Sequence, residues 1–244
     1  MNLVIDIGNS RTKAAVFDHN NLIKDYSFSV FNEKNLEKIL GEYSGINKAI
    51  ISSVAGEPVD FYKMISGKIR NTLLLDENTP LPVNNQYKSK NTLGKDRLAA
   101  VVGANYIYPD NNILVIDAGT AITYDFIDQH GNYSGGNISP GLAIRFKALH
   151  NFTGRLPLLS KQDVYPELGT DTDSAIISGV QTGIIHEIEG YIAHYSGIYT
   201  NITIILTGGD ANFFDKKLKN TIFVNLNLVN IGLNCILDYN ADNL

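Results

Sequence analysis

The stretch that decides the fold is Asp6-Ile7-Gly8-Asn9-Ser10-Arg11-Thr12-Lys13, which follows directly on the apolar run Leu3–Ile5. An apolar run that ends in small, turn-forming residues is typical of a buried strand that enters a tight turn. Such a turn presents consecutive backbone N–H groups, which can form a nest for an anion. Because Ser10 adds a hydroxyl donor and Lys13 adds a cation, the stretch favours a phosphate-binding loop.

A second turn of the same kind begins the other half of the chain. Ile113–Ile116 predicts a strand, Asp117-Ala118-Gly119-Thr120 follows it, and Ala121–Ile127 predicts the returning strand. Strand, turn and strand therefore recur in the same order, and mixed helices and strands follow in each half. We expect an α/β protein of two similar lobes, formed by residues 1–110 and 111–244.

The composition limits the classes of function. The chain has 20 Lys+Arg against 25 Asp+Glu, and a net charge of -5 argues against broad neutralisation of nucleic-acid phosphates. Cys235 is the only cysteine, which excludes an internal disulfide framework. No apolar run approaches the ~20 residues of a membrane helix, and no signal peptide is visible before Asp6. We expect a cytoplasmic protein that binds neither membrane nor nucleic acid.

The two usual nucleotide-binding signatures, Gly-x4-Gly-Lys-Ser/Thr and Gly-x-Gly-x-x-Gly after a strand, are absent. A carboxylate at Asp6, beside an anion site, instead suggests Mg²⁺, which nucleotide sites hold through water with one or two carboxylates. Asp117 is the natural second carboxylate, and Thr120 is a second donor to phosphate. The structural alternative is that each aspartate only caps its turn.

Three further segments have both a functional and a structural interpretation. In Thr207-Gly208-Gly209-Asp210, the glycines would let a flat ligand lie against the backbone, or Asp210 would only cap a helix. Residues 135–141 are predicted to form a glycine-rich loop before a helix. In Gly94-Lys95-Asp96-Arg97, the aspartate suits a general base and the arginine suits capture of a carboxylate, or the segment only starts a helix.

Together these segments resemble type III pantothenate kinases. The resemblance rests on Asp6–Lys13, Gly94–Arg97, Asp117–Asp125, Gly136–Leu142 and Thr207–Asp210. Since that family belongs to the superfamily of acetate and sugar kinases, Hsp70 and actin, it implies two lobes of the actin-like ATPase (ribonuclease H-like) fold with a central cleft. It also implies transfer of the γ-phosphate of ATP to the primary hydroxyl of pantothenate, giving 4'-phosphopantothenate in the first step of coenzyme A biosynthesis.

The resemblance implies roles for single residues, with Asp96 as the catalytic base. The implied pantothenate contacts are Tyr87, Gly94, Lys95, Asp96, Arg97 and Thr172. The implied ATP contacts are Asp6, Ile7, Gly8, Asn9, Ser10, Arg11, Thr12, Lys13, Thr120, Gly208 and Gly209. Asp117 would bind a monovalent cation, K⁺ or NH₄⁺, and Asp6 would hold Mg²⁺ through water. The family is homodimeric, and the neighbouring subunit supplies part of each pantothenate site.

Lys95 departs from the pattern, because the family often has a small or acidic residue there; its charge would assist the substrate carboxylate or point to solvent. Two alternative functions stay open. Some members of the family resemble transcriptional accessory factors that keep the fold without catalysis, although the presence of Lys13, Asp96 and Arg97 favours an enzyme. The other alternative is a related kinase that acts on a different alcohol bearing a carboxylate.

Overall fold

The structure is a computed structural model that describes residues 1–53 and 59–243, and it divides into two compact units. Unit 1 comprises Met1–Asp110, Ile127–Ser134 and Asn227–Leu244, and unit 2 comprises Asn111–Phe126 and Gly135–Leu226. The lobes expected at residues 1–110 and 111–244 stay a prediction. The observed units differ from them chiefly because the last helix belongs to unit 1.

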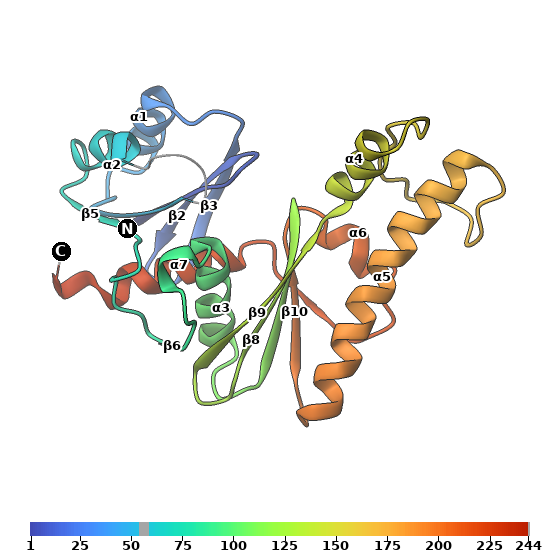
Figure 1. The fold of residues 1–244 in the computed structure, drawn as a ribbon. Coiled ribbons are helices and arrows are strands. Elements are labelled where there is room, and N and C mark those ends of the chain that lie inside the picture. Colours follow the sequence, from blue (N-terminus) through green and yellow to red (C-terminus); the bar gives the residue numbers. More distant parts are fainter. Residues whose placement is uncertain (54–58, 244) are drawn as a thin grey trace. The chain divides into compact units, whose positions relative to one another are not determined.

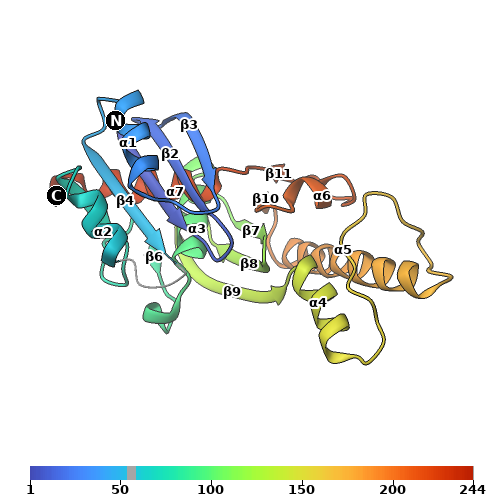
Figure 2. The same cartoon turned by 90° about the horizontal axis from the view of Figure 1, so that it is seen from above.

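Unit 1 is built on a five-stranded sheet with the order β3-β2-β1-β4-β5 (Figures 1 and 2). The strands are β1 (Asn2–Ile7), β2 (Thr12–Asp18), β3 (Asn21–Phe28), β4 (Lys48–Ser53) and β5 (Asn71–Leu74). β1, β2 and β3 are antiparallel neighbours, whereas β4 runs parallel to β1 and β5 parallel to β4. Every residue of β1 is buried, as expected for a central strand covered on both faces.

The helices of unit 1 include a closely packed pair, α3 and α7, which lie side by side (Figure 1). The helices are α1 (Glu33–Glu42), α2 (Val59–Ser66), α3 (Lys95–Ile107) and α7 (Leu228–Tyr239), with short 3-10 turns at Lys90–Thr92 and Ala241–Asn243. A Cβ on Gly232 would lie 1.7 Å from the carbonyl oxygen of Ala99, and one on Gly103 would lie 2.4 Å from that of Leu228. The pair therefore needs glycine on both helices.

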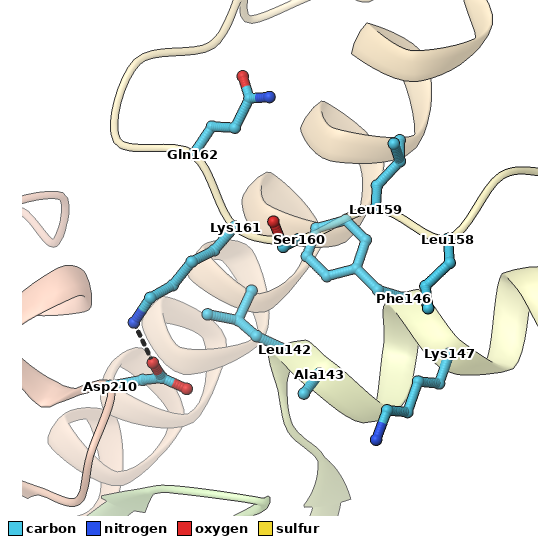
Figure 3. A pocket seen from close by; sticks show the side chains of 10 residues that line it. All are labelled: Leu142, Ala143, Phe146, Lys147, Leu158, Leu159, Ser160, Lys161, Gln162 and Asp210. Carbon is cyan, nitrogen blue, oxygen red and sulfur yellow. Dashed lines mark hydrogen bonds and ion pairs between the residues drawn. The ribbon is translucent and has the colours of Figure 1, made fainter.

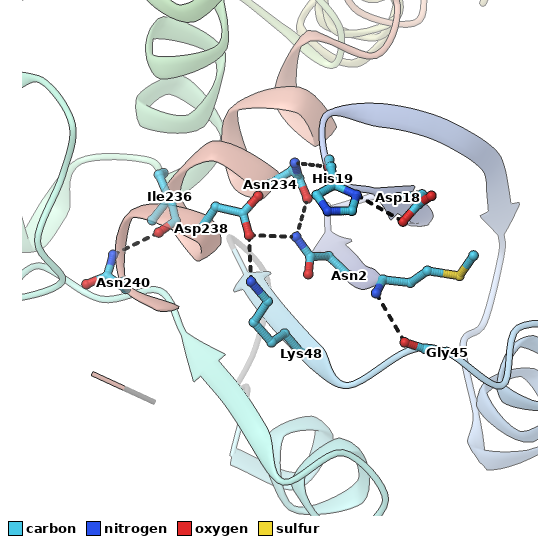
Figure 4. A network of polar contacts seen from close by, with 10 residues as sticks. Asn2, Asp18, His19, Gly45, Lys48, Asn234, Ile236, Asp238 and Asn240 are labelled. Atoms are coloured by element: carbon cyan, nitrogen blue, oxygen red, sulfur yellow. Dashed lines mark hydrogen bonds and ion pairs between the residues drawn. The ribbon is translucent and has the colours of Figure 1, made fainter. Parts of the chain in front are cut away.

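Polar side chains fasten α7 to the strands of unit 1 (Figure 4). Asp238 accepts hydrogen bonds from Nζ of Lys48 at 2.7 Å and from Nδ2 of Asn2 at 3.0 Å. Asn234 accepts from the same Asn2 nitrogen at 2.8 Å and donates to the carbonyl oxygen of His19 at 3.0 Å. Because Asn2 and Asn234 are buried, these bonds satisfy groups that would be costly to leave unpaired. The C-terminal helix is an integral part of unit 1.

Unit 2 contains most of a second sheet, with the order β11-β10-β7-β8-β9-β6. Its strands are β7 (Ile113–Ala118), β8 (Ala121–Ile127), β9 (Asn132–Pro140), β10 (Thr203–Thr207) and β11 (Phe223–Val224), and β6 (Asn84–Asn85) pairs with the part of β9 that lies in unit 1. The order β9-β8-β7-β10-β11 repeats that of the first sheet, and β10 runs parallel to β7 as β4 does to β1. The predicted repetition of one α/β plan is confirmed.

Three helices complete unit 2: α4 (Leu142–Phe152), α5 (Thr172–Ile198) and α6 (Ala211–Asp215). α5 begins with a capping box, in which Asp171 accepts from the N–H of Ser174 at 2.9 Å and its own N–H donates to Oγ of Ser174 at 3.2 Å. Its apolar face is in one core with β7 and β8. No helix among residues 1–53 and 59–243 is long and apolar enough to cross a membrane.

The predicted glycine-rich loop at residues 135–141 is wrong, because β9 continues as far as Pro140. Gly135 has a φ of +116°, a conformation that favours glycine. A Cβ on Gly136 would lie 2.0 Å from the carbonyl oxygen of Tyr124 on the neighbouring strand. The glycines therefore allow two strands to approach closely, and they do not interrupt the strand.

Candidate active site

Three side chains form a row across the sheet of unit 1. In the strand register, Asp6 on β1 is paired with Lys13 on β2 and with Ser52 on β4. Oγ of Ser52 donates a hydrogen bond to Oδ1 of Asp6 at 3.1 Å, and both residues are buried. The row places a hydroxyl, a carboxylate and an ammonium group on neighbouring strands, beside the end of β1.

The chain between β1 and β2 makes the predicted tight turn. The N–H of Gly8 donates to the carbonyl oxygen of Arg11 at 3.1 Å, while Asn9, Ser10 and Arg11 are exposed. Thr12, by contrast, is buried at the start of β2. The exposed part of the turn leaves backbone and hydroxyl groups accessible, as binding of a phosphate at an anion nest requires.

Asp96 lies in the first turn of α3, where its Oδ1 accepts a hydrogen bond from the N–H of Arg97 at 2.8 Å. Burial raises the pKa of Asp6, and the charge of Asp96 raises it further, to about 6. The hydrogen bond from Ser52 and the charge of Lys13 act in the opposite direction. Unit 1 thus brings together two carboxylates that come from separate sequence motifs.

Arg97 is buried against an aromatic stack. Only 5% of the residue is exposed, and its guanidinium carbon lies 5.6 Å from the centre of the Tyr87 ring. Tyr87 in turn stacks on the buried Tyr133, with ring centres 6.2 Å apart and 11° between the planes. The stack supports the cation and fixes its direction. Two of the residues expected to contact one substrate, Tyr87 and Arg97, are therefore neighbours.

In unit 2, the predicted second phosphate turn lies beside the segment that follows β10. Because β10 pairs with β7, Thr207 lies opposite Asp117. A Cβ on Gly208, whose φ is +96°, would lie 2.4 Å from Oδ1 of Asp117. The N–H of Asp210 donates to the carbonyl oxygen of Ala118 at 2.9 Å. Close approach of the two segments therefore depends on glycine at this position.

The start of α4 adjoins the same turn. The N–H of Gly141 donates to the carbonyl oxygen of Thr120 at 3.1 Å, and a Cβ on Gly141 would lie 2.3 Å from the carbonyl oxygen of Gly119. Three motifs of unit 2 thus meet around one turn. Thr172 is elsewhere in the unit, exposed as the first residue of α5.

Comparison with known proteins identifies the family of the chain. The family model described as type III pantothenate kinase matches residues 2–194. A type III pantothenate kinase from Bacteroides fragilis is 47% identical over 244 residues, which cover 98% of this chain and 98% of that protein. The chain belongs to the type III pantothenate kinase family. The predicted family and enzyme class are thereby confirmed.

Solved structures confirm the expected fold of the kinase. A Baf family protein from Campylobacter jejuni, described as a transcriptional activator, has a TM-score of 0.64 at 24% identity and covers 98% of this chain and 99% of its own. An activator of 2-hydroxyisocaproyl-CoA dehydratase from Clostridium difficile, with bound ADPNP, has a TM-score of 0.57 at 13% identity and covers 99% and 96%. At such identities, the likeness concerns the fold alone.

A cavity of about 590 Å³ opens beside Asp210 of the kinase (Figure 3). Lys161 extends across one side of it and forms an ion pair with Asp210, whose side chain makes no capping hydrogen bond to α6. The wall is equally divided between apolar residues, which are Leu142, Ala143, Phe146, Leu158 and Leu159, and polar ones, which are Lys147, Ser160, Lys161, Gln162 and Asp210. A concave surface that combines apolar side chains with placed polar groups is typical of small-molecule sites.

The structure also shows the surroundings of the predicted site residues and two further side chains beside them. Lys95 does not point to solvent, because its side chain is 13% exposed and Nζ lies 4.0 Å from Glu77. Ser52 was missed, although it lies opposite Asp6 near the end of β4 as Thr207 lies opposite Asp117 at the end of β10. Lys161 was also missed, and no motif in its surroundings marks it.

Proposed function

We propose that this kinase transfers the γ-phosphate of ATP to the primary hydroxyl of pantothenate, the first step of coenzyme A biosynthesis. The similarity over the whole chain to a type III pantothenate kinase supports the reaction. The observation that carries the mechanism is the electrostatic proximity of Asp96 to Asp6 in unit 1, with Lys13 paired to Asp6 in the sheet. It supports Asp96 as the base, beside the turn that we propose to bind phosphate.

The groups that hold ATP supply charge and alignment. Phosphoryl transfer passes through a loose transition state, so positioning and neutralisation of the phosphate oxygens account for most of the catalysis. In unit 1, the turn of residues 6–13 offers N–H groups, the hydroxyl of Ser10 and the ammonium of Lys13. In unit 2, the hydroxyl of Thr120 and the backbone at Gly208 and Gly209 contact the nucleotide, and the cavity beside Asp210 receives its apolar part.

Asp96 accepts the proton of the pantothenate hydroxyl as that oxygen attacks the γ-phosphorus. Its carboxylate is half-buried and oriented by the N–H of Arg97, so it is held in place at the start of a rigid helix. Arg97 pairs with the pantothenate carboxylate, and Tyr87 supports the guanidinium from one face. Gly94, Lys95 and Thr172 complete the proposed contacts.

Two cations belong to the proposal. The buried carboxylate of Asp6 and the nearby Asp96 form the kind of oxygen-rich, mutually repelling pair that a divalent cation stabilises, so the residues present fit Mg²⁺ held through water by Asp6. When bound, Mg²⁺ neutralises charge on the phosphate oxygens. Asp117, beside Thr207 and the carbonyl groups of its turn, would hold K⁺ or NH₄⁺. A homodimer, with part of the pantothenate site supplied by the neighbour, is also proposed.

The first test is a coupled assay of ADP release from the wild type with pantothenate, with neutral sugars, with another carboxylate-bearing alcohol and with no acceptor. Release that depends on pantothenate is expected. Release with another acceptor alone would favour a related kinase, and the absence of release with every acceptor would favour a non-catalytic accessory factor. Omission of Mg²⁺, and replacement of K⁺ by Na⁺, test the two cations in the same assay.

The second test is Asp96→Asn, which keeps the shape of the side chain but removes the base. We expect kcat to fall by about 10²–10⁴-fold, the usual contribution of a general base. Affinity for a non-hydrolysable ATP analogue should stay near the wild-type value, because Asp96 binds the acceptor. A kcat close to that of the wild type would remove Asp96 from this role.

The third test is Arg97→Lys, which keeps the charge and loses the planar fork. We expect the KM for pantothenate to rise about tenfold or more, with a small effect on the KM for ATP. The reason is that a hydrogen bond to a charged group contributes about 1.5–3 kcal/mol, and a bidentate pair has two of them. The same exchange at the exposed Arg70 is the control. An unchanged KM for pantothenate would contradict the clamp.

A further inference from the structure

Arg145, in the first turn of α4, ties the end of β9 to another helix of unit 2. Its Nε donates to the carbonyl oxygen of Pro140 at 2.8 Å, and its Nη2 donates to Oγ of Ser139 at 3.0 Å. Nη2 also forms an ion pair with Glu187 on α5. A single guanidinium thus holds the last two residues of a strand and a carboxylate of a separate helix, which requires a planar fork of donors.

Glu187 is itself held from the opposite side. The hydroxyl of Tyr124 on β8 donates to Oε1 of Glu187 at 2.9 Å, and Tyr124 is fully buried. Burial would raise the pKa of Glu187, but hydrogen bonds from Arg145, Ser139 and Tyr124 outweigh it and hold that pKa below its usual value. The carboxylate is therefore ionised at neutral pH, and the network is anchored in the core of unit 2.

The residue that follows this clamp touches the second phosphate turn. Gly141 donates its N–H to the carbonyl oxygen of Thr120, and its Cα faces the carbonyl oxygens of Gly119 and Thr120 so closely that a Cβ would lie 2.3 and 2.6 Å from them. The backbone of Gly141 contacts the backbone of Gly119 and Thr120 directly, so no flexible side chain lies between them to absorb a displacement of Gly141. A shift of Pro140 therefore moves the turn as well.

We propose that Arg145 is a positioning residue for the nucleotide. By clamping Ser139 and Pro140 to Glu187, it holds Gly141 against the turn at Gly119–Thr120, and so fixes the groups that meet the phosphate chain. The inference rests on the proposed kinase function, which assigns that turn to ATP. The contacts of Arg145 are to Ser139, Pro140 and Glu187, so its loss should act on ATP through the turn, whereas the proposed carboxylate clamp for pantothenate lies in unit 1 at Tyr87 and Arg97.

The test compares Arg145→Met, Arg145→Lys and Glu187→Gln with the wild type, and uses Arg70→Met, at an exposed arginine of unit 1, as the charge-matched control. In Arg145→Met, the KM for ATP and the Kd for a non-hydrolysable ATP analogue should rise about ten- to hundredfold, the size of effect that small misplacements produce. The KM for pantothenate should change by less than about twofold, because the proposed clamp for that substrate lies at Tyr87 and Arg97 in unit 1. A mere loss of folded enzyme would alter neither KM, so the two KM values separate positioning from instability. Arg145→Lys keeps the positive charge for the ion pair with Glu187 but loses the planar fork. Its KM for ATP and its Kd for the analogue should therefore lie between those of the wild type and those of Arg145→Met.

Three outcomes would overturn the inference: a KM for ATP near the wild-type value, equal increases in both KM values, or a loss of kcat alone that follows the loss of folded protein. If Arg145→Met does not fold, Arg145→Lys and Glu187→Gln decide, and the absence of the KM split in both refutes the role. A wild type that binds the ATP analogue without phosphorylating pantothenate would refute the proposed function instead. The Kd comparison would still test Arg145 in that case.

Discussion

At the scale of single residues, Asp6 is placed where it lowers the stability of unit 1. Its pKa is about 6 in the folded chain against 3.8 for an ordinary aspartate, because of burial and the neighbouring Asp96. The folded state therefore binds more protons than the unfolded state between these values, so the free energy of unfolding falls as the pH rises from about 4 to about 6. Charged groups arranged for a ligand rather than for stability are typical of active sites.

We predict that Asp6→Asn raises the thermal unfolding midpoint above pH 6 and abolishes phosphorylation. Without Mg²⁺ or nucleotide, the gain should be about 1–3 kcal/mol above pH 6 and should shrink to about 0.5 kcal/mol near pH 4, where Asp6 is protonated in the folded wild type and only partly ionised in the unfolded chain. Thermal melts between pH 4 and pH 8 in EDTA measure it. Ser52→Ala is the matched control, and it should lower the thermal unfolding midpoint above pH 6 where Asp6→Asn raises it. The reason is that it removes a hydrogen bond that favours the charged carboxylate of Asp6. A gain that is equal at all pH values would contradict this electrostatic origin.

At the scale of elements, the contact between α3 and α7 supports the helix that carries Asp96 and Arg97. We predict that Gly232→Ala lowers the free energy of unfolding by about 2 kcal/mol or more, because its Cβ would overlap the carbonyl group of Ala99. Gly190→Ala, in the middle of α5, is the control, since no atom lies within 4 Å of its added Cβ. There the same substitution should stabilise by about 0.5–1 kcal/mol. Urea titrations of both variants measure the difference, and a mild effect of Gly232→Ala would mean that the helices separate easily.

Elements were predictable where local pattern decides them. The apolar runs before Asp6 and Asp117 predicted β1 and β7, and helical spacing predicted α3. The glycines of β9 were misinterpreted, because a sequence does not show whether a glycine serves a turn or the approach of another backbone. The clamp of Arg145 could not be predicted either. Arg145 and Glu187 are 42 residues apart in the sequence, and no local pattern indicates that their side chains meet.

At the scale of the whole molecule, the duplicated plan was predictable from two turns of the same kind, but the division of the chain was not. The sequence offers no sign that residues 227–244 belong with the first half, because that choice is made by packing against α3 and by polar bonds to Asn2 and Lys48. The role of the two turns in binding phosphate stays a prediction, although the structure shows both turns in the expected place after β1 and β7. Ser52, which contacts Asp6, and Lys161, which contacts Asp210, could be found only from the folded structure, because they are distant from these residues in the sequence.

We predict that a chain truncated after Leu226 loses the order of unit 1. Removal of α7 exposes the apolar side of α3 and deprives the buried Asn2 of Asn234 and Asp238. Limited proteolysis should then cut first within residues 1–110, whereas the full chain resists under the same conditions. Equal resistance of both chains in this range would show that unit 1 does not need its last helix.

The return of the last helix to unit 1 also has a consequence in time. During synthesis at about 5–20 residues per second, on the order of ten seconds pass between the emergence of α3 and that of α7. Throughout this interval, the nascent chain carries the groups assigned to catalysis on a helix that still lacks its neighbour. We therefore expect the groups assigned to catalysis to become ordered only after α7 has emerged, and a chain that stops before Leu228 to be inactive.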